Sequence, residues 1–175
     1  MYFADLALCY YHTGPCDADA WQSPLRAIGW LEHPHSFSKG DTHPELLKRL
    51  ETLIAASHAH YSSYAFRGQH QCSLCQFGVS VQPRDVRSHV NIWIPGERCI
   101  YIAPGMITHY VSDHGYQPPE EFVTAVLRCP EHGSADYCAA LQAANLDSPP
   151  PLKPKDQVDA EFKLEIERAL ARRRM

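Results

Sequence analysis

The sequence predicts an α+β fold in which a small antiparallel sheet packs against several helices. Two patterns predict it: apolar residues recur at helical spacing in one segment, and they alternate with polar residues in a later one. Composition agrees, because 45% hydrophobic and 21% charged residues are typical of a globular domain with its own core.

The N-terminal part of the chain gives few periodic signals. Residues 2–11 and 25–31 are strand-like in composition, but the Pro, Gly and aromatic residues around them indicate irregular structure. A helix beginning near His43 is better marked, because Pro44 suits a first turn and apolar residues follow at helical spacing. It should end within residues 57–61. Its apolar positions are Leu46, Leu47, Leu50, Leu53 and Ile54.

Three strands are predicted after this helix. In residues 88–94 apolar and polar side chains alternate, the period expected of a strand with one buried and one solvated face. The stretches 77–81 and 99–103 are shorter and rich in β-branched and aromatic residues. Because residues 95–98 have the composition of a turn, residues 88–103 should form a hairpin.

Three further helices are predicted from their end signals. Proline suits the first turn of a helix, serine its N-cap and glycine the position after its last turn. The signals are Pro104 and Gly115 for a helix that contains His109, Pro118 and Cys129–Pro130 for the next, and Ser134 for the start of the third.

The chain divides into one domain and an appendage. Residues 1–145 should form a single zinc-stabilised α+β domain, for the reasons given below, and residues 146–157 are a Pro-rich linker. Residues 158–175 should form a charged C-terminal helix, which would dock on its own domain or on a second copy. Its narrow apolar stripe consists of Phe162, Ile166, Ala169 and Leu170.

Charge and cysteine content limit the function classes. A net charge of −4 argues against broad nucleic-acid binding, which needs clustered Lys and Arg. No apolar run reaches the length of a bilayer span, and the first residues lack the basic region of a signal peptide. We therefore expect a cytoplasmic protein without a membrane partner, whose seven cysteines are thiols.

The stretch RGQHQCSLC carries a Cys-x-x-Cys pair, Cys72 and Cys75, with three interpretations. A redox dithiol should precede a helix, whereas the residues after Cys75 have strand-like composition. Two buried core thiols are an alternative. Metal binding is favoured because His109 and His114 follow with four intervening residues, within the H-x(3–5)-H range of structural zinc sites.

The fourth ligand stays open between His114 and His70. On a regular helix His114 lies about 140° around from His109. A left-handed turn at Gly115 would ease that separation. His70 precedes Cys72 by two positions, so both side chains would point the same way in an extended segment. The sequence therefore predicts one Zn²⁺ bound by the two cysteines, His109 and one of these two histidines.

Other potential ligands have simpler interpretations. Cys129 and His132 form a Cys-x-x-His pair that could belong to a second site, but no matching partners lie nearby in the sequence, and a helix end is the favoured explanation of Cys129–Pro130. The remaining cysteines fit as core or surface thiols and the remaining histidines as solvated polar residues.

Two segments, RGQHQCSLC and IYIAPGMITHYVSDHGYQPPEEFVTAVLRCP, resemble an uncharacterised bacterial family of small proteins marked by RGxHxCxxC and a downstream IxHYVxxHxYxPPxEFxxAV. The segments YFADL and IGWLEHPHSF are similar to that family's opening. The resemblance covers residues 2–129 in patches and leaves out the linker and the last helix. It implies a shared fold and supplies no reaction. It also implies importance for His70, Cys72, Cys75, His109 and His114.

Three functions are compatible with a metal site of this kind. A zinc closed by four protein ligands is structural, which favours a non-catalytic module that binds another protein or a second copy of itself. Its partner surface would be the aromatic region around Trp30 and Phe37 or the C-terminal helix.

The alternatives need further groups. A metal-dependent hydrolase or nuclease needs an open ligand position and a base, for which Glu97, Glu120 and Asp113 are candidates. His89 and Asn91 suggest a nuclease pair, or simply the solvated face of the hairpin. The third alternative is weak binding of single-stranded nucleic acid, through stacking on Trp93 and Tyr101. Whether the protein is an enzyme thus stays open, and no catalytic residue is assigned.

Overall fold

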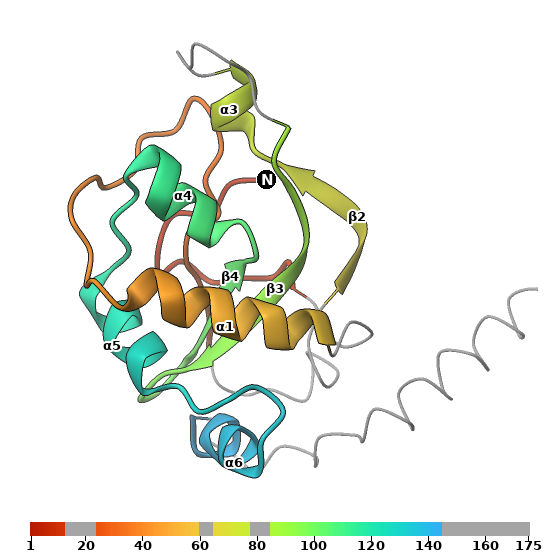
Figure 1. The fold of residues 1–175 in the computed structure, drawn as a ribbon, viewed down its shortest axis with the longest axis vertical. Helices are drawn as coiled ribbons and strands as arrows, with labels where there is room; N and C mark the ends of the chain where they lie inside the picture. The colour runs from red at the N-terminus through yellow and green to blue at the C-terminus, as the bar shows by residue number, and fades with distance from the viewer. Residues whose placement is uncertain (13–23, 60–64, 78–84, 145–175) are drawn as a thin grey trace, which may run out of the picture.

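The computed structural model describes residues 1–12, 24–59, 65–77 and 85–144. It has the predicted α+β architecture, a four-stranded mixed sheet with helices around it (Figure 1). The strands are β1 Leu25–Ala27, β2 Ala65–Gln71, β3 Arg87–Pro95 and β4 Ile100–Pro104. The helices are α1 Leu46–Ala59, α3 Ser73–Phe77, α4 Ile107–His114, α5 Glu120–Arg128 and α6 Ala135–Ala144.

The predicted hairpin is the centre of the sheet. Strands β3 and β4 pair antiparallel, with Trp93 opposite Ile102, and the strand order is β1-β4-β3-β2. β2 pairs antiparallel with β3, and the short β1 pairs parallel with β4. The sheet is therefore mixed, because β1 enters from the N-terminal segment and runs alongside β4.

Both faces of β3 are buried, which corrects the expectation of one solvated face. Every residue from Val90 to Ile94 is buried, and Asn91 has no exposed surface. On the polar side, the ring of His89 contacts that of His58 on α1, with centroids 5.3 Å apart. Figure 1 shows α1 lying across the hairpin, so a helix covers the face that alternation alone assigns to water.

The N-terminal residues are irregular, as predicted, and are tied to β1. The amides of Leu6 and Cys9 donate to the carbonyls of Ala27 and Leu25, at 2.8 Å each. Trp30 lies in the core with 1% of its surface exposed, and its indole N–H donates to the carbonyl of Ile102. Trp30 therefore belongs to the core, which corrects its assignment to a partner surface.

The later helices follow the predicted order with one shifted start. Pro104 is the last residue of β4, and α4 begins at Ile107. α5 ends before Cys129, and the Ser134 hydroxyl accepts a hydrogen bond from the amide of Tyr137, capping α6 as expected.

The segment after the cysteine pair is helical where a strand was predicted. Phe77 ends the short helix α3, and the rest of the predicted strand 77–81 lies outside the described residues. The linker 146–157 and the C-terminal helix 158–175 also lie outside them. Among the helices described here, none combines the length and apolar character needed to cross a membrane.

Candidate metal centre

The two cysteines sit where β2 passes into α3. Cys72 directly follows β2, and its amide donates to the carbonyl of Val86 at 3.0 Å. Cys75 lies inside α3, whose first turn directs the Cys75 amide at the sulfur of Cys72, 3.4 Å away. Both thiols are buried. An N–H aimed at a sulfur stabilises negative charge there, so this turn suits a thiolate ligand.

Both histidines lie on α4, His109 in its first turn and His114 as its last residue. Their Nε2 atoms lie 3.2 Å apart, and the two rings are nearly perpendicular, at 86°. Gly115 takes the left-handed conformation, with φ 65°, only after His114, which is still helical. The two imidazole rings therefore approach each other although their backbone positions lie on different sides of the helix. Gly115 ends α4 immediately after His114.

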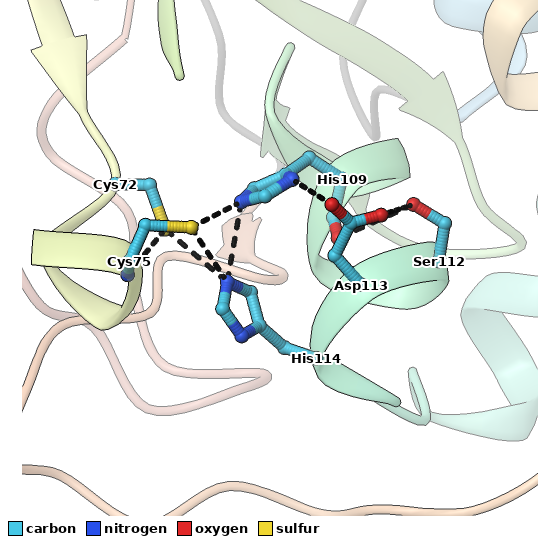
Figure 2. Close-up of polar contacts among 6 residues, drawn as sticks. All are labelled: Cys72, Cys75, His109, Ser112, Asp113 and His114. Atoms are coloured by element: carbon cyan, nitrogen blue, oxygen red, sulfur yellow. Dashed lines mark hydrogen bonds and ion pairs between the residues drawn. The ribbon is translucent and has the colours of Figure 1, made fainter. Parts of the chain in front are cut away.

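Figure 2 shows both imidazoles pointing from α4 towards the cysteine turn. The Cys75 sulfur lies 3.3 Å from Nε2 of His109 and 3.4 Å from Nε2 of His114, which also lies 3.4 Å from the Cys72 sulfur. All four donor atoms lie within 4.8 Å of one another. We call Cys72, Cys75, His109 and His114 the four-residue cluster.

These separations match the edges of a zinc tetrahedron. With Zn–S near 2.3 Å and Zn–N near 2.05 Å, ideal geometry places two nitrogens about 3.3 Å apart and a sulfur about 3.6 Å from a nitrogen. In the cluster the two nitrogens lie 3.2 Å apart, and three sulfur–nitrogen pairs lie at 3.3–3.4 Å, with every remaining pair within 4.8 Å. The donor atoms are thus arranged so that one ion of this size could contact all four.

The carboxylate of Asp113 contacts His109 at the ring nitrogen that is not directed at the cysteines. Oδ2 of Asp113 lies 3.2 Å from Nδ1 of His109, and the Ser112 hydroxyl donates to Oδ1 of the same carboxylate at 2.7 Å. This contact fixes the orientation of the ring and leaves Nε2 facing the cysteines, as in many carboxylate–histidine–metal arrangements. The sequence named Asp113 as a candidate base. Its position four residues after His109 on the same helix is the sequence feature that could have indicated this contact.

Burial affects the protonation of two members of the cluster, Cys72 and His114. Desolvation raises the pKa of Cys72 to about 11, so this thiol is neutral near pH 7 unless a cation compensates it. Burial, together with the neighbouring His109, lowers the pKa of His114, which favours the neutral imidazole that a metal requires. Although α3 supplies the helix that a redox pair needs, a raised thiol pKa is opposite to that of a reactive dithiol.

His70 and the Cys129–His132 pair lie apart from the cluster. The His70 ring packs against Trp30, with centroids 6.0 Å apart. Cys129 is buried, with its pKa raised by desolvation to about 12, and Nδ1 of His132 lies 2.9 Å from the Ser57 hydroxyl. Of the chain as described, the four-residue cluster is the only group of three or more His, Cys, Asp or Glu with metal-binding separations.

The other functional residues proposed from the sequence do not form a second site in the described structure. Glu97 lies in the β3–β4 turn and Glu120 begins α5, whereas Asp113 contacts a cluster histidine. Trp93 and Tyr101 are buried, so neither ring is displayed for stacking with a base. Asn91 is buried too, which removes the interpretation of His89 and Asn91 as a solvated face.

Comparison with known proteins gives a family and no activity. No curated protein and no solved structure matches the chain. A family model described as "Domain of unknown function (DUF7919)" matches residues 1–127, a stretch that contains the whole four-residue cluster. The chain belongs to this family.

Proposed function

We propose that the four-residue cluster binds one zinc ion with a structural role, and that the protein is a non-catalytic interaction module. One observation carries the proposal: two thiols and two imidazoles present four donor atoms within 4.8 Å of one another, and four of their six separations are 3.2–3.4 Å, close to tetrahedral edges. Four protein ligands would leave no position for water or substrate, so the ion would contribute folding free energy.

Donor chemistry favours zinc over other divalent ions. Thiolate and imidazole are typical zinc ligands, whereas magnesium and calcium prefer oxygen. The ion would join the end of β2 and α3, which has only five residues, to α4. A helix this short is unstable alone, so a cross-link through the metal ion would stabilise it.

Exposed apolar side chains support an interaction role. Phe77, two positions after Cys75 in α3, is 62% exposed, and Leu8 and Tyr10 are 61% and 81% exposed. A zinc that fixes α3 would also fix Phe77 at the surface, and large exposed apolar side chains are common in interfaces. The partner is another protein or a second copy of this chain.

Metal content and coordination test the zinc. Native mass spectrometry should give one zinc per chain, and X-ray absorption should show two sulfur and two nitrogen neighbours. Cys75→Ser should lose the metal and lower the melting temperature strongly, whereas Cys138→Ser, at a half-buried thiol outside the cluster, should change neither. A coordinated water in place of a protein ligand would support the hydrolase instead.

Sedimentation velocity tests the partner. A Phe77→Ser variant should retain zinc and its melting temperature, and should weaken self-association or capture of a purified candidate partner. If the wild type stays monomeric across the micromolar range, the second copy is excluded. If Phe77→Ser leaves all association unchanged, the surface around α3 is not the interface.

A further inference from the structure

A cavity lies where the β3–β4 turn meets β1 and α5. Figure 1 shows α5 apart from α3, which carries Cys75. The cavity is open and has a volume of about 760 Å³, within the usual range for small-molecule sites. Its charged and aromatic lining consists of Arg26, Arg98, Arg128, Glu97, Glu121 and Tyr101. None of these residues belongs to the four-residue cluster.

The three arginines converge from separate parts of the chain. Arg26 lies on β1, Arg98 in the turn and Arg128 at the end of α5. A hydrogen bond of 3.1 Å from Arg26 to the carbonyl of Leu6 holds its guanidinium in place. Judged on the described part of the chain, no carboxylate lies within 4.0 Å of any of the three guanidinium groups, although two glutamates line the same cavity.

The β3–β4 turn, which lines the cavity, packs closely against Tyr101. A Cβ on Gly96 would lie 2.7 Å from Cε2 of Tyr101 and 3.0 Å from the carbonyl of Cys99, so the turn rests directly on the Tyr101 ring. The Tyr101 pKa is raised by burial and by Cys99 and Glu121, which keeps the phenol protonated and able to donate a hydrogen bond. The turn that carries Arg98 is therefore seated against the core.

We propose that this cavity binds a small phosphorylated molecule. Guanidinium groups that are not neutralised by carboxylates are the preferred protein partners of phosphate oxygens, which they bind in a bidentate manner. Three arginines and two glutamates line the cavity, which leaves one net positive charge, and a ligand with more negative charge is attracted more strongly. A phosphate monoester carries about −1.5 to −2 at pH 7 and offers three acceptor oxygens, whereas a single carboxylate carries one charge.

Calorimetry with pyrophosphate as the probe tests the site on the full, zinc-loaded chain at low ionic strength. The wild type should bind one pyrophosphate per chain, and an Arg98→Gln/Arg128→Gln double variant should bind it at least about tenfold more weakly, since charged hydrogen bonds are being removed. Both side chains are exposed, so the variant should fold normally. Arg67→Gln, an exposed arginine on β2 outside the cavity, is the matched control.

Amide spectra locate the binding. Pyrophosphate should shift the signals of Gly96, Arg98 and Thr124 and leave those of His109 and its neighbours unchanged. The proposal is overturned if pyrophosphate does not bind at about 10 mM, if Arg67→Gln weakens it as much as the double variant, which would mark general charge attraction, or if citrate binds equally well, which would mark a carboxylate site.

Discussion

At the scale of single residues, Asp113 is the group that orients His109. Its carboxylate lies 3.2 Å from Nδ1 of that ring and is itself held by the Ser112 hydroxyl. Asp113→Asn should lower zinc affinity about 10- to 100-fold, the usual effect of losing such an outer contact, because the ring is no longer held with Nε2 towards the cysteines. Competition with a chelator of known affinity measures this change.

A control variant distinguishes the loss of ring orientation from the loss of one negative charge as the cause of a lower zinc affinity. Asp41→Asn removes the same charge from an exposed loop and should leave the affinity unchanged. Circular dichroism should show both variants folded in excess zinc. Equal affinities for Asp113→Asn and the wild type would mean that the histidine needs no orienting partner.

Asp5 is a half-buried carboxyl group whose ionisation opposes stability. Its Oδ1 accepts the amide of Gly29 at 2.9 Å and the hydroxyl of Tyr116 at 2.8 Å, yet desolvation still raises its pKa above the usual aspartate value. The folded state therefore keeps this proton at pH values where the unfolded state has lost it. Its contribution is most favourable below the unfolded pKa and declines as the pH rises through the folded pKa.

Asp5→Asn keeps an oxygen acceptor and removes the titration. The free energy of unfolding of this variant, relative to the wild type, should therefore increase as the pH rises from about 4 to 7. Taking the difference cancels every pH dependence that both proteins share, including that of a metal bound to the four-residue cluster. Asp5→Ala should instead cost about 1–3 kcal/mol, because the buried Tyr116 hydroxyl loses its acceptor. A relative stability that falls with pH would contradict the assignment.

At the scale of elements, two glycines with similar φ angles should respond differently to substitution by alanine. Gly115 ends α4 at φ 65°, and no atom lies within 4 Å of the place a Cβ would take, so Gly115→Ala should cost about 1 kcal/mol of unfolding free energy from strain alone. Gly29, at φ 67°, would place a Cβ 3.2 Å from Ile107 and 3.3 Å from Tyr116. Gly29→Ala should therefore cost more, because crowding adds to strain.

Urea unfolding measures both costs. Gly68→Ala is the control, because Gly68 has neither a positive φ nor an atom within 4 Å of an added Cβ. It should remain within about 0.5 kcal/mol of the wild type, as surface changes usually do. If Gly29→Ala and Gly115→Ala cost the same, packing around Gly29 would be looser than these distances indicate.

Elements with strong local signals were predictable, and those shaped by distant contacts were not. The hairpin and the cap of α6 follow from alternation, turn composition and Ser134, all of which act within a few residues. α3 was missed because Phe77 and its neighbours have β composition, whereas the turn at Cys72 sets the local backbone. Burial of both faces of β3 depends on α1 crossing the sheet, which no periodicity within the strand reveals.

At the scale of the whole molecule, ligand spacing predicted the candidate metal centre nearly completely. Cys72, Cys75 and His109 could be named from sequence, because structural zinc sites use short, regular intervals. The choice between His114 and His70 could not be made, since it depends on how β2 is placed against α4. The arginine-lined cavity was invisible for the same reason: its charges come from three segments that only the fold brings together.

The C-terminal helix expected at residues 158–175 remains a prediction, because it lies outside the described residues. A helix of this length is marginal alone in water, so its apolar stripe should need a surface to cover it. Ending the chain at Pro149 should therefore lower the free energy of unfolding by about 2 kcal/mol if the helix docks on its own domain, as expected for burying one or two large apolar side chains. If it docks on a second copy, the truncated chain should instead sediment as a smaller species.

A substitution within the stripe gives the control for this truncation. Phe162→Ser should reproduce the loss of stability or of association, whereas Lys163→Ser, next to it on the charged side, should not. Melting temperature and sedimentation velocity, measured at several concentrations, distinguish docking within the chain from docking between chains, because only the second depends on concentration. A truncated chain with the same melting temperature and the same oligomeric state as the full chain would show that the segment packs on neither surface.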